Sequence, residues 1–287
     1  MKNILITGSR GFIGRNIVEN LSNFFHITEI DLATGYNLLD PHALDNIAGD
    51  FDAVIHLAGV TFVPDSYQRP QYFYDVNFNT TLNTAEFCRK NKTGKFIYLN
   101  TYVYGQPQYQ PIDELHPLSL PSPYHKSKKL AEDLVTGYFN QNDTKVIVLR
   151  LFNIFGKHQE DKFLIPKMVK GAIHDRQMHI MDAEPKRDYI YINDFVELIH
   201  KVLDSTNTDA GIFNVGTGQS FSVQELINAI KSVLGTDIKV TNENIRRPNE
   251  IMDCRANITK VTTTFHWQPK ESLESALRDY IRWCKNV

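Results

Sequence analysis

Two residues four positions apart, Tyr124 and Lys128, have the types and spacing that proton transfer requires. They lie in the segment SPYHKSKKLAED, and on a helix this spacing places both side chains on one face. A lysine charge favours the phenolate and so lowers the pKa of a nearby tyrosine from about 10. Tyr124 is therefore a candidate general acid/base for interconverting a hydroxyl group and a ketone. The spacing alone also fits a solvated helix face, so its weight depends on its place in the fold.

A glycine-rich segment, ITGSRGFIGRNI, follows the first apolar run of the chain. Gly8 permits a tight turn, Gly11 lets the backbone approach a pyrophosphate, and Gly14 allows a helix to pack closely on a strand. The helix that follows offers free N–H groups and a positive dipole end to phosphates. This position predicts dinucleotide binding rather than a purely structural turn. The intervening residues expected to border the same ligand are Arg10, Phe12 and Ile13.

The choice between NAD and NADP depends on two side chains. Asp31 stands at the end of the expected second strand, where a carboxylate accepts hydrogen bonds from a ribose diol and repels a 2′-phosphate. Arg10 argues the other way, because a guanidinium in the glycine loop could pair with a 2′-phosphate. The two residues together favour NAD and leave NADP possible.

The elements that must position these residues alternate along the first half of the chain. Apolar runs predict strands, and longer amphipathic stretches predict helices. The expected strands are 4–7, 26–32, 52–59, 95–100 and 144–152, and the expected helices are 12–24, 69–90 and 122–140. This order predicts an α/β fold with a Rossmann-type doubly wound parallel sheet, whose ligands bind at the carboxyl ends of the strands.

The second half predicts a smaller α/β domain whose chain returns once to the first sheet. Helices are expected at 163–174, 193–203, 222–235 and 271–285, a short strand at 187–192, and a returning sheet strand at 211–218. Ser222 and Glu225 form a capping box at the start of one helix. We therefore expect one domain of residues 1–155 plus about 188–216 and another of about 156–187 plus 217–287.

Composition limits the classes of partner. The 287 residues carry a formal charge of −2, which provides no basic field for nucleic acid or an anionic membrane. The three cysteines, Cys88, Cys254 and Cys284, form neither a disulfide framework nor a zinc spacing. No apolar run approaches the length of a membrane span, and the start MKNILITG does not resemble a signal peptide. We expect a cytoplasmic protein.

Motifs along nearly the whole chain resemble those of the extended short-chain dehydrogenase/reductase family, in its branch of nucleotide-sugar epimerases and dehydratases. Besides the glycine loop, the matching segments are HLAG (56–59), Asn77 in its long helix, YLNTYVYG (98–105), SPYHKSK (122–128), LRLFNIFG (149–156), RDYIYIND (187–194), FNVGTG (213–218), RRPNE (246–250) and FHWQPKESLESALRDYIRW (265–283). So many matches in order make coincidence a poor explanation.

The resemblance implies that the first domain holds NAD or NADP and the second a nucleotide diphosphate sugar. Tyr124 would exchange a proton with a sugar hydroxyl, usually at carbon 4, where the nicotinamide takes or gives hydride, and Lys128 would bind the nicotinamide ribose. Further cofactor contacts would come from Asn37, Leu38, Leu57, Ala58, Gly59 and Asn77. Contacts to the nucleotide diphosphate would come from Asn153, Arg187 and Arg247, and to its ribose from Glu250; otherwise these are surface ion pairs and a loop amide.

One departure affects the catalytic set. The family usually places Ser or Thr three residues before the Val of its Val-Tyr-Gly segment, whereas this chain has Asn100 there, followed by Thr101. An amide can donate to a sugar oxygen, but it cannot relay a proton as a hydroxyl can. Either Thr101 takes the role or Asn100 binds without relaying, because adjacent residues of a regular strand face opposite sides.

Three functions remain open at this stage. Asp31 favours an epimerase, which retains its NAD, whereas the short connection after the second strand favours a 4-keto-6-deoxysugar reductase. A dehydratase is disfavoured because Tyr102 and Val103 follow Thr101, where that group often has Asp-Glu. A catalytically silent dinucleotide-binding sensor is the remote alternative. The resemblance also implies a homodimer built on the helices that contain Tyr72 and Tyr124.

Overall fold

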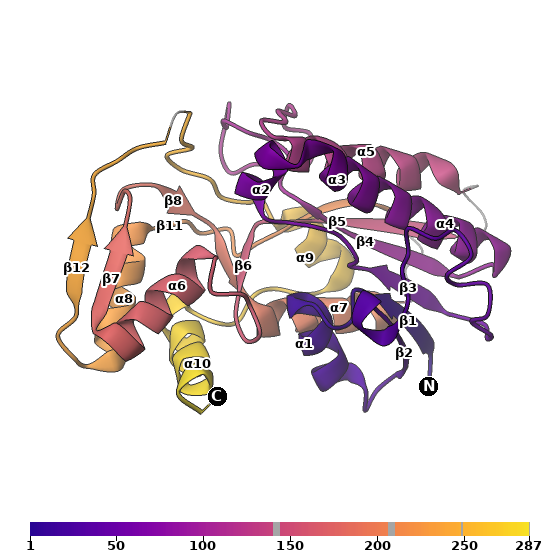
Figure 1. Cartoon of the computed structure of the whole chain (residues 1–287), viewed down its shortest axis with the longest axis horizontal. Coiled ribbons are helices and arrows are strands. Elements are labelled where there is room, and N and C mark those ends of the chain that lie inside the picture. Colours follow the sequence, from indigo (N-terminus) through magenta and orange to yellow (C-terminus); the bar gives the residue numbers. More distant parts are fainter. Residues whose placement is uncertain (140–143, 206–209, 248, 287) are drawn as a thin grey trace. The chain divides into compact units, whose positions relative to one another are not determined.

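The computed structural model describes residues 1–139, 144–205, 210–247 and 249–286. Its chain forms two compact units (Figure 1). The first unit comprises Met1–Gly105, Pro117–Leu151 and His200–Phe213, and the second comprises Gln106–His116, Phe152–Ile199 and Asn214–Val287. The expected assignment of the cofactor to one domain and the substrate to the other stays a prediction.

A six-stranded sheet, ordered β10-β5-β4-β3-β1-β2, is the centre of the first unit. Its strands are β1 (Asn3–Thr7), β2 (His26–Ile30), β3 (Ala53–His56), β4 (Lys95–Thr101), β5 (Lys145–Leu151) and β10 (Gly211–Val215). The pairings of β1 with β2 and β3, of β3 with β4 and of β4 with β5 are all parallel. The expected doubly wound sheet and its returning strand are therefore confirmed. The strand order reverses between β1 and β3, the place where such sheets bind ligands.

Helices cover both faces of this sheet (Figure 1). They are α1 (Phe12–Leu21), α2 (Val63–Gln68), α3 (Pro70–Tyr74), α4 (Thr80–Lys90) and α5 (Pro123–Tyr138), with a short 3₁₀ turn, η1 (Leu32–Thr34), after β2. Helices α3, α4 and α5 lie on one face and α1 lies on the other. The helix expected over 69–90 contains a π-helical segment, η2 (Asp75–Asn79), between α3 and α4.

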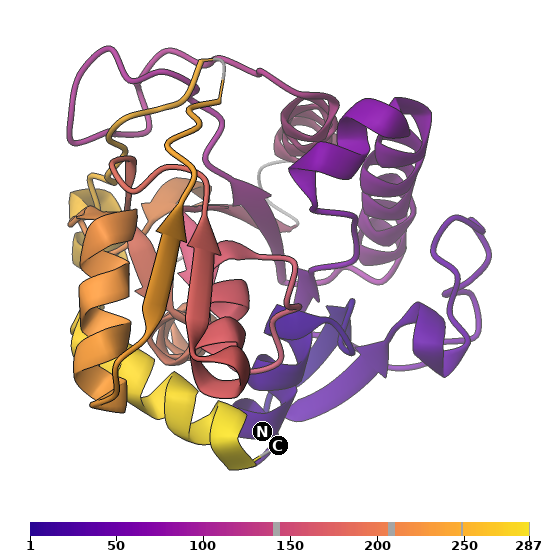
Figure 2. The ribbon, with the colours of Figure 1, turned by 60° about the vertical axis from the view of Figure 1, so that its left-hand side comes forward.

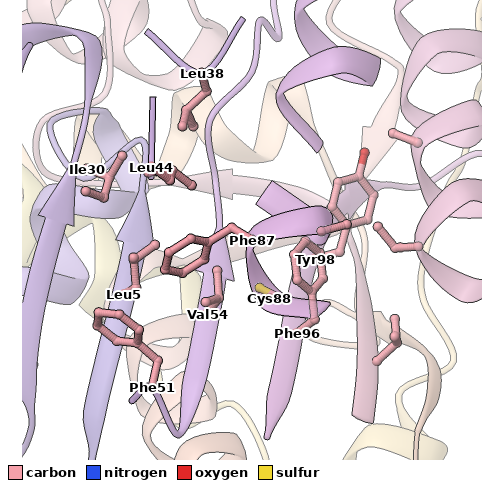
Figure 3. Packing of buried hydrophobic residues seen from close by; sticks show 14 of the residues in the cluster. Leu5, Ile30, Leu38, Leu44, Phe51, Val54, Phe87, Cys88, Phe96 and Tyr98 are labelled. Atoms are coloured by element: carbon pink, nitrogen blue, oxygen red, sulfur yellow. The ribbon is translucent and has the colours of Figure 1, made fainter. Parts of the chain in front are cut away.

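A hydrophobic cluster fixes α4 and α5 to the sheet (Figure 3). Alternate residues of the strands point into it, because successive side chains of a strand face opposite sides. These are Leu5, Val54, Phe96, Tyr98, Val146 and Val148. Phe87 and Cys88 of α4 and Ala131 and Val135 of α5 pack against them. The periodicity of the apolar residues therefore decides which face of each helix meets the sheet.

The second unit is an α/β arrangement of short strands and longer helices (Figure 2). Its strands are β6 (Asn153–Phe155), β7 (Gln177–Ile180), β8 (Lys186–Arg187), β9 (Tyr189–Tyr191), β11 (Phe221–Ser222) and β12 (Lys239–Asn242). Its helices are α6 (Leu164–Lys170), the π-helical η3 (Gly171–Asp175), α8 (Val223–Leu234), α9 (Thr259–Phe265) and α10 (Leu273–Asn286), while α7 (Ile192–Asp204) spans the boundary between the units.

One local prediction for the second unit is confirmed, and one pair of strands was missed. Ser222 and Glu225 form the expected capping box of α8. The strands β7 and β12, which pair in parallel, alternate polar and apolar residues over four positions at most and were not expected. Among the described residues, no helix is long and apolar enough to cross a membrane.

The core makes a direct prediction about stability. Phe96 is fully buried in the cluster of Figure 3, so Phe96→Ala should lower the free energy of unfolding by about 3–5 kcal/mol in urea titrations. Phe24, which is 54% exposed and packs on the His200 ring, offers a control, and Phe24→Ala should cost less than about 1 kcal/mol. Equal losses in the two variants would contradict this description of the core.

Candidate active site

The glycine loop has the geometry that each of its glycines predicted. Gly8 adopts a φ of +71° and donates its N–H to the Ile30 carbonyl over 2.8 Å. A Cβ on Gly14 would lie 2.3 Å from the Gly8 carbonyl oxygen, so only glycine permits α1 to pack this closely. Gly11 caps α1 without a side chain, which leaves the start of the helix open to a phosphate group. The loop therefore fits a dinucleotide.

The Asp31 side chain binds the backbone N–H of Arg10 and not its guanidinium. Asp31 Oδ2 accepts the Arg10 backbone N–H over 3.0 Å, and its Oδ1 accepts the Ala33 N–H over 2.9 Å. The Arg10 guanidinium pairs instead with Glu29, the last but one residue of β2. The guanidinium that could have bound a 2′-phosphate is thus paired with Glu29, and the Asp31 carboxylate remains at the end of β2, which favours NAD.

The expected adenine contacts differ in exposure. Asn37 is exposed, and its Oδ1 accepts the Leu39 N–H over 3.1 Å. Leu38 is buried in the hydrophobic cluster, and its carbonyl accepts from the Asn83 side chain over 2.8 Å. The Leu38 side chain is therefore part of the hydrophobic core, so any contact of this residue with a ligand would come from its backbone.

A chain of hydrogen bonds runs beneath the ends of β1 and β3. Thr81 donates to the Asn77 carbonyl over 2.7 Å, so its hydroxyl must accept from His56 Nε2, 3.0 Å away. His56 Nδ1 then accepts from the Thr7 hydroxyl over 2.8 Å. The Thr7 oxygen accepts in turn the N–H groups of Leu57 and Ala58. Only the neutral Nε2–H form of His56 satisfies every group.

Asn77 connects the loop after β3 to α5. Its Oδ1 accepts the Val60 N–H over 2.8 Å, and its Nδ2 donates to the Ser127 hydroxyl over 2.9 Å. A Cβ on Gly59 would lie 2.7 Å from Asn77 Oδ1, so the loop can approach only with glycine there. The π-helical segment that contains Asn77 supplies its inward orientation, a use that π-bulges often have at functional sites.

Tyr124 lies in the first turn of α5, which Ser122 caps by accepting the His125 N–H. The phenol is buried, and its ring meets Phe73 edge-on. Burial raises the pKa of Tyr124, while a hydrogen bond from the Thr101 side chain opposes that shift. The structure therefore brings Tyr124 together with Thr101.

Lys128 is buried against the end of β4, while its expected contact with a nicotinamide ribose stays a prediction. Its Nζ donates to the Leu99 carbonyl over 2.7 Å and lies 4.3 Å from the centre of the Tyr98 ring. Burial lowers the pKa of Lys128 to about 7, and the negative charge of Glu132 opposes that shift. The expected lowering of the Tyr124 pKa by the lysine charge is not seen, because burial dominates both groups.

Asn100 faces away from this pair of hydroxyls and into a buried network. Its Nδ2 donates to Glu132 Oε2 over 2.6 Å, and its Oδ1 accepts the Thr101 N–H over 2.8 Å. Arg150 donates to both oxygens of Glu132 and to the Tyr104 hydroxyl. The sequence reasoning missed Glu132, Arg150 and Tyr104. An arginine inside the apolar run VIVLRLF was the signal that could have revealed a buried partner.

Three of the four expected substrate contacts lie close together in the second unit. Asn153 donates its backbone N–H to the Asp188 carbonyl, and its Oδ1 is buried without a hydrogen-bond partner among the described residues. The neighbouring Arg187 pairs with Glu250, two residues that were expected to bind the ligand separately. Arg247 is exposed. These roles stay predictions.

The sequence profile of the "NAD dependent epimerase/dehydratase family" matches residues 4–216. This chain belongs to that family. UDP-glucose 4-epimerase of Bacillus subtilis (strain 168) is 31% identical over 98% of this chain and 96% of its own length. The solved UDP-N-acetylglucosamine 4-epimerase of Methanobrevibacter ruminantium M1, in complex with UDP-N-acetylmuramic acid, has 27% identity and a TM-score of 0.91, covering 99% of this chain and 98% of that one. RMD from Pseudomonas aeruginosa complexed with NADPH has 26% identity and a TM-score of 0.90, with both chains fully covered.

The family's glycine loop leads to a binding prediction. Gly14→Ala places a methyl group against backbone atoms of Gly8 and Ser9, so the loop must move. We expect the affinity for NAD to fall at least about tenfold, measured by calorimetry on protein stripped of cofactor. Gly137→Ala, where a Cβ would meet nothing within 4 Å, should keep the original affinity. Unchanged binding by Gly14→Ala would contradict the assignment of this loop.

The buried His56 should make the free energy of unfolding depend on pH. Burial, and secondarily the charge of Lys128, lowers its pKa from 6.5 to about 3. At pH values between these two pKa values, His56 binds a proton in the unfolded chain but not in the folded chain. The free energy of unfolding should therefore fall as the pH drops from 6.5, by about 1.4 kcal/mol per pH unit, and this contribution is constant above pH 6.5.

Urea unfolding between pH 4.5 and 6.5 measures this slope. In His56→Gln the slope should be smaller by the stated amount, whereas His26→Gln, at an exposed histidine, should retain it. An identical slope in His56→Gln and the unmodified protein would show that His56 is not held neutral.

Proposed function

We propose that this protein is an NAD-dependent nucleotide-sugar 4-epimerase in which Tyr124 is the acid/base. The observation that carries the proposal is that the Thr101 side chain lies beside the buried Tyr124 phenol, at the carboxyl end of β4 in a sheet that begins with a dinucleotide-type glycine loop. A sugar hydroxyl that joins these two groups would have a direct route for its proton.

The relatives favour epimerisation over the other activities of the family. The Bacillus subtilis relative, 31% identical over nearly its full length, is a UDP-glucose 4-epimerase. The 4-ketosugar reductase is not favoured. A UDP-linked hexose is accordingly the first substrate class to examine. A silent sensor would have no use for a buried Tyr124 phenol beside the Thr101 side chain.

The residues of the first unit fit the cofactor that the family name implies. Gly8, Gly11 and the start of α1 would hold the pyrophosphate, Asp31 an adenosine ribose, and Ala58 with Gly59 the path toward the nicotinamide. NAD, when bound, supplies the acceptor and donor of a hydride. The close approach of Gly59 to Asn77 leaves that path lined by backbone.

The second unit would bind the nucleotide diphosphate. The buried Asn153 Oδ1 lacks a partner among the described residues and could accept from a hydroxyl or N–H group of the nucleotide sugar. Arg187 forms its pair with Glu250 at 15% and 12% side-chain exposure, and a guanidinium at this place matches the oxygens of a phosphate group. Exposed Arg247 would add a second charge.

The proton steps follow from the first unit alone. Tyr124 would accept the proton of the sugar's C4 hydroxyl, with the Thr101 hydroxyl bonded to the same oxygen. Lys128, when protonated, would stabilise the Tyr124 phenolate that must be present before this step. After the 4-ketosugar presents its other face, Tyr124 would return the proton. Burial of the phenol excludes water that could otherwise compete for this proton.

The proposal extends to assembly and location. A homodimer is supported by large apolar side chains on two neighbouring helices, Tyr72 on α3 and Leu130 on α5, which are 41% and 46% exposed. A cytoplasmic location is supported by three free cysteines, of which Cys88 and Cys254 are buried.

The test begins with freshly purified protein. Mass spectrometry after denaturation should find about one NAD per chain, because an epimerase returns the hydride that it takes. Proton NMR should then follow UDP-glucose or another UDP-hexose to its C4 epimer without net formation of NADH. Tyr124→Phe should reduce kcat by about 10²–10⁴-fold with little change in melting temperature.

Other products would refute the proposal. Net consumption of NADPH with a 4-ketosugar would identify a reductase. Normal turnover by Tyr124→Phe would remove Tyr124 from the chemistry, whatever the product.

A further inference from the structure

The residue that departs from the family pattern, Asn100, is the starting point. It lies on β4 next to Thr101 and is 5% exposed. Both ends of its amide have partners: Glu132 accepts from its nitrogen, and the Thr101 backbone N–H donates to its oxygen. The amide orientation is fixed, because a carboxylate can only face the nitrogen and an N–H can only face the oxygen.

The partner of Asn100 is itself held firmly. Glu132 and Arg150 form a buried ion pair with side chains 1% and 3% exposed, and their closest atoms lie 2.6 Å apart. Arg150 Nε donates over 3.0 Å to the same carboxylate oxygen that Asn100 binds. This two-point contact fixes the plane of the carboxylate and hence the position of the Asn100 amide.

We infer that Asn100 is a positioning residue: anchored by the Glu132–Arg150 pair, it holds the backbone of Thr101 so that the Thr101 hydroxyl meets Tyr124. This inference rests on the proposed function. It deepens that function by assigning the relay hydroxyl to Thr101 and a supporting task to the residue in the family's usual hydroxyl position. A serine in position 100 would offer one oxygen, whereas the amide supplies the separate acceptor and donor that this connection requires.

The surroundings of Tyr124 determine what a loss of positioning would do. The titratable side chains around it are Lys128 and His125 on its own helix, and Tyr98 and Tyr102 on and just after β4. Among these contacts, the Thr101 hydrogen bond lowers the pKa of Tyr124, against burial and Tyr102, which raise it. Misplacing Thr101 would therefore raise this pKa and move the rising part of a kcat–pH profile to higher pH.

A double-mutant cycle on the full-length protein with its cofactor tests the inference. Thr101→Val should reduce kcat by about 10- to 100-fold, and Asn100→Ala by about tenfold, with KM changed less than about twofold in each. In the Thr101→Val background, Asn100→Ala should reduce kcat by less than about twofold further, because the hydroxyl that it positions is gone. The single variants and the double variant should show the same shift of the pH profile.

Equal factors for Asn100→Ala in both backgrounds would overturn the inference, since Asn100 would then act independently of Thr101. So would an unshifted pH profile in Asn100→Ala, or kcat unchanged by it. Asn214→Ala, which removes another buried amide that donates to the Ile112 carbonyl, is the matched control and should show no coupling to Thr101→Val.

Two further measurements separate the possible failures. Ultraviolet titration of tyrosine ionisation, taken as the difference from Tyr124→Phe, should show a higher Tyr124 pKa in Asn100→Ala even without turnover, and an unchanged value would reject the inference. If the unmodified protein does not interconvert UDP-hexoses, the proposed function fails at that point. If it does and the cycle is additive, only the positioning role fails.

Discussion

The ion pair between Glu132 and Arg150 is the constraint on which the catalytic edge of the sheet depends. It connects α5 to β5 in a place where neither charge meets water. Burial would raise the pKa of Glu132, yet the hydrogen bonds and charge of Arg150 keep it below its ordinary value. Removing one partner of such a pair typically costs about 3–5 kcal/mol, because the other charge is left buried. Asn100 on β4 donates to the same carboxylate, so the helix with Tyr124 and the strand with Thr101 are held in one arrangement.

A second polar network of different character lies at the neighbouring strand ends. It is neutral, and its order is set by hydroxyl groups around His56 rather than by charge. Through Thr7 it reaches the start of the glycine loop, and through Asn77 it reaches the loop after β3 and then α5. The expected cofactor region and the proton-transfer region thus share a connected framework of buried hydrogen bonds.

The features that the sequence could predict are those set by local pattern. Continuous apolar runs indicated the parallel strands, and the spacing around Gly14 indicated a close helix–strand contact that a Cβ would prevent. Pairings between distant residues have no such local signal. The roles of Asn100 and Thr101 could be told apart only from the hydrogen bond between Asn100 and Glu132, which lies 32 residues away. The bond between Arg187 and Glu250 spans 63 residues. Burial also reversed the expected direction of the Tyr124 pKa, which residue spacing cannot reveal.

The π-helical segment Asp75–Asn79 sets a register for everything on either side of it. A π-turn accommodates one more residue than an α-turn, and each helical residue rotates the chain by about 100°. Phe73 before the segment and Ala85 after it are both buried. In a regular helix the two residues would be offset by about 120°, and the π-turn removes this offset by absorbing one residue, so that both stay buried. A chain that lacked one residue here could therefore bury the same two faces in a regular helix, but it would lose the π-turn that directs Asn77 inward.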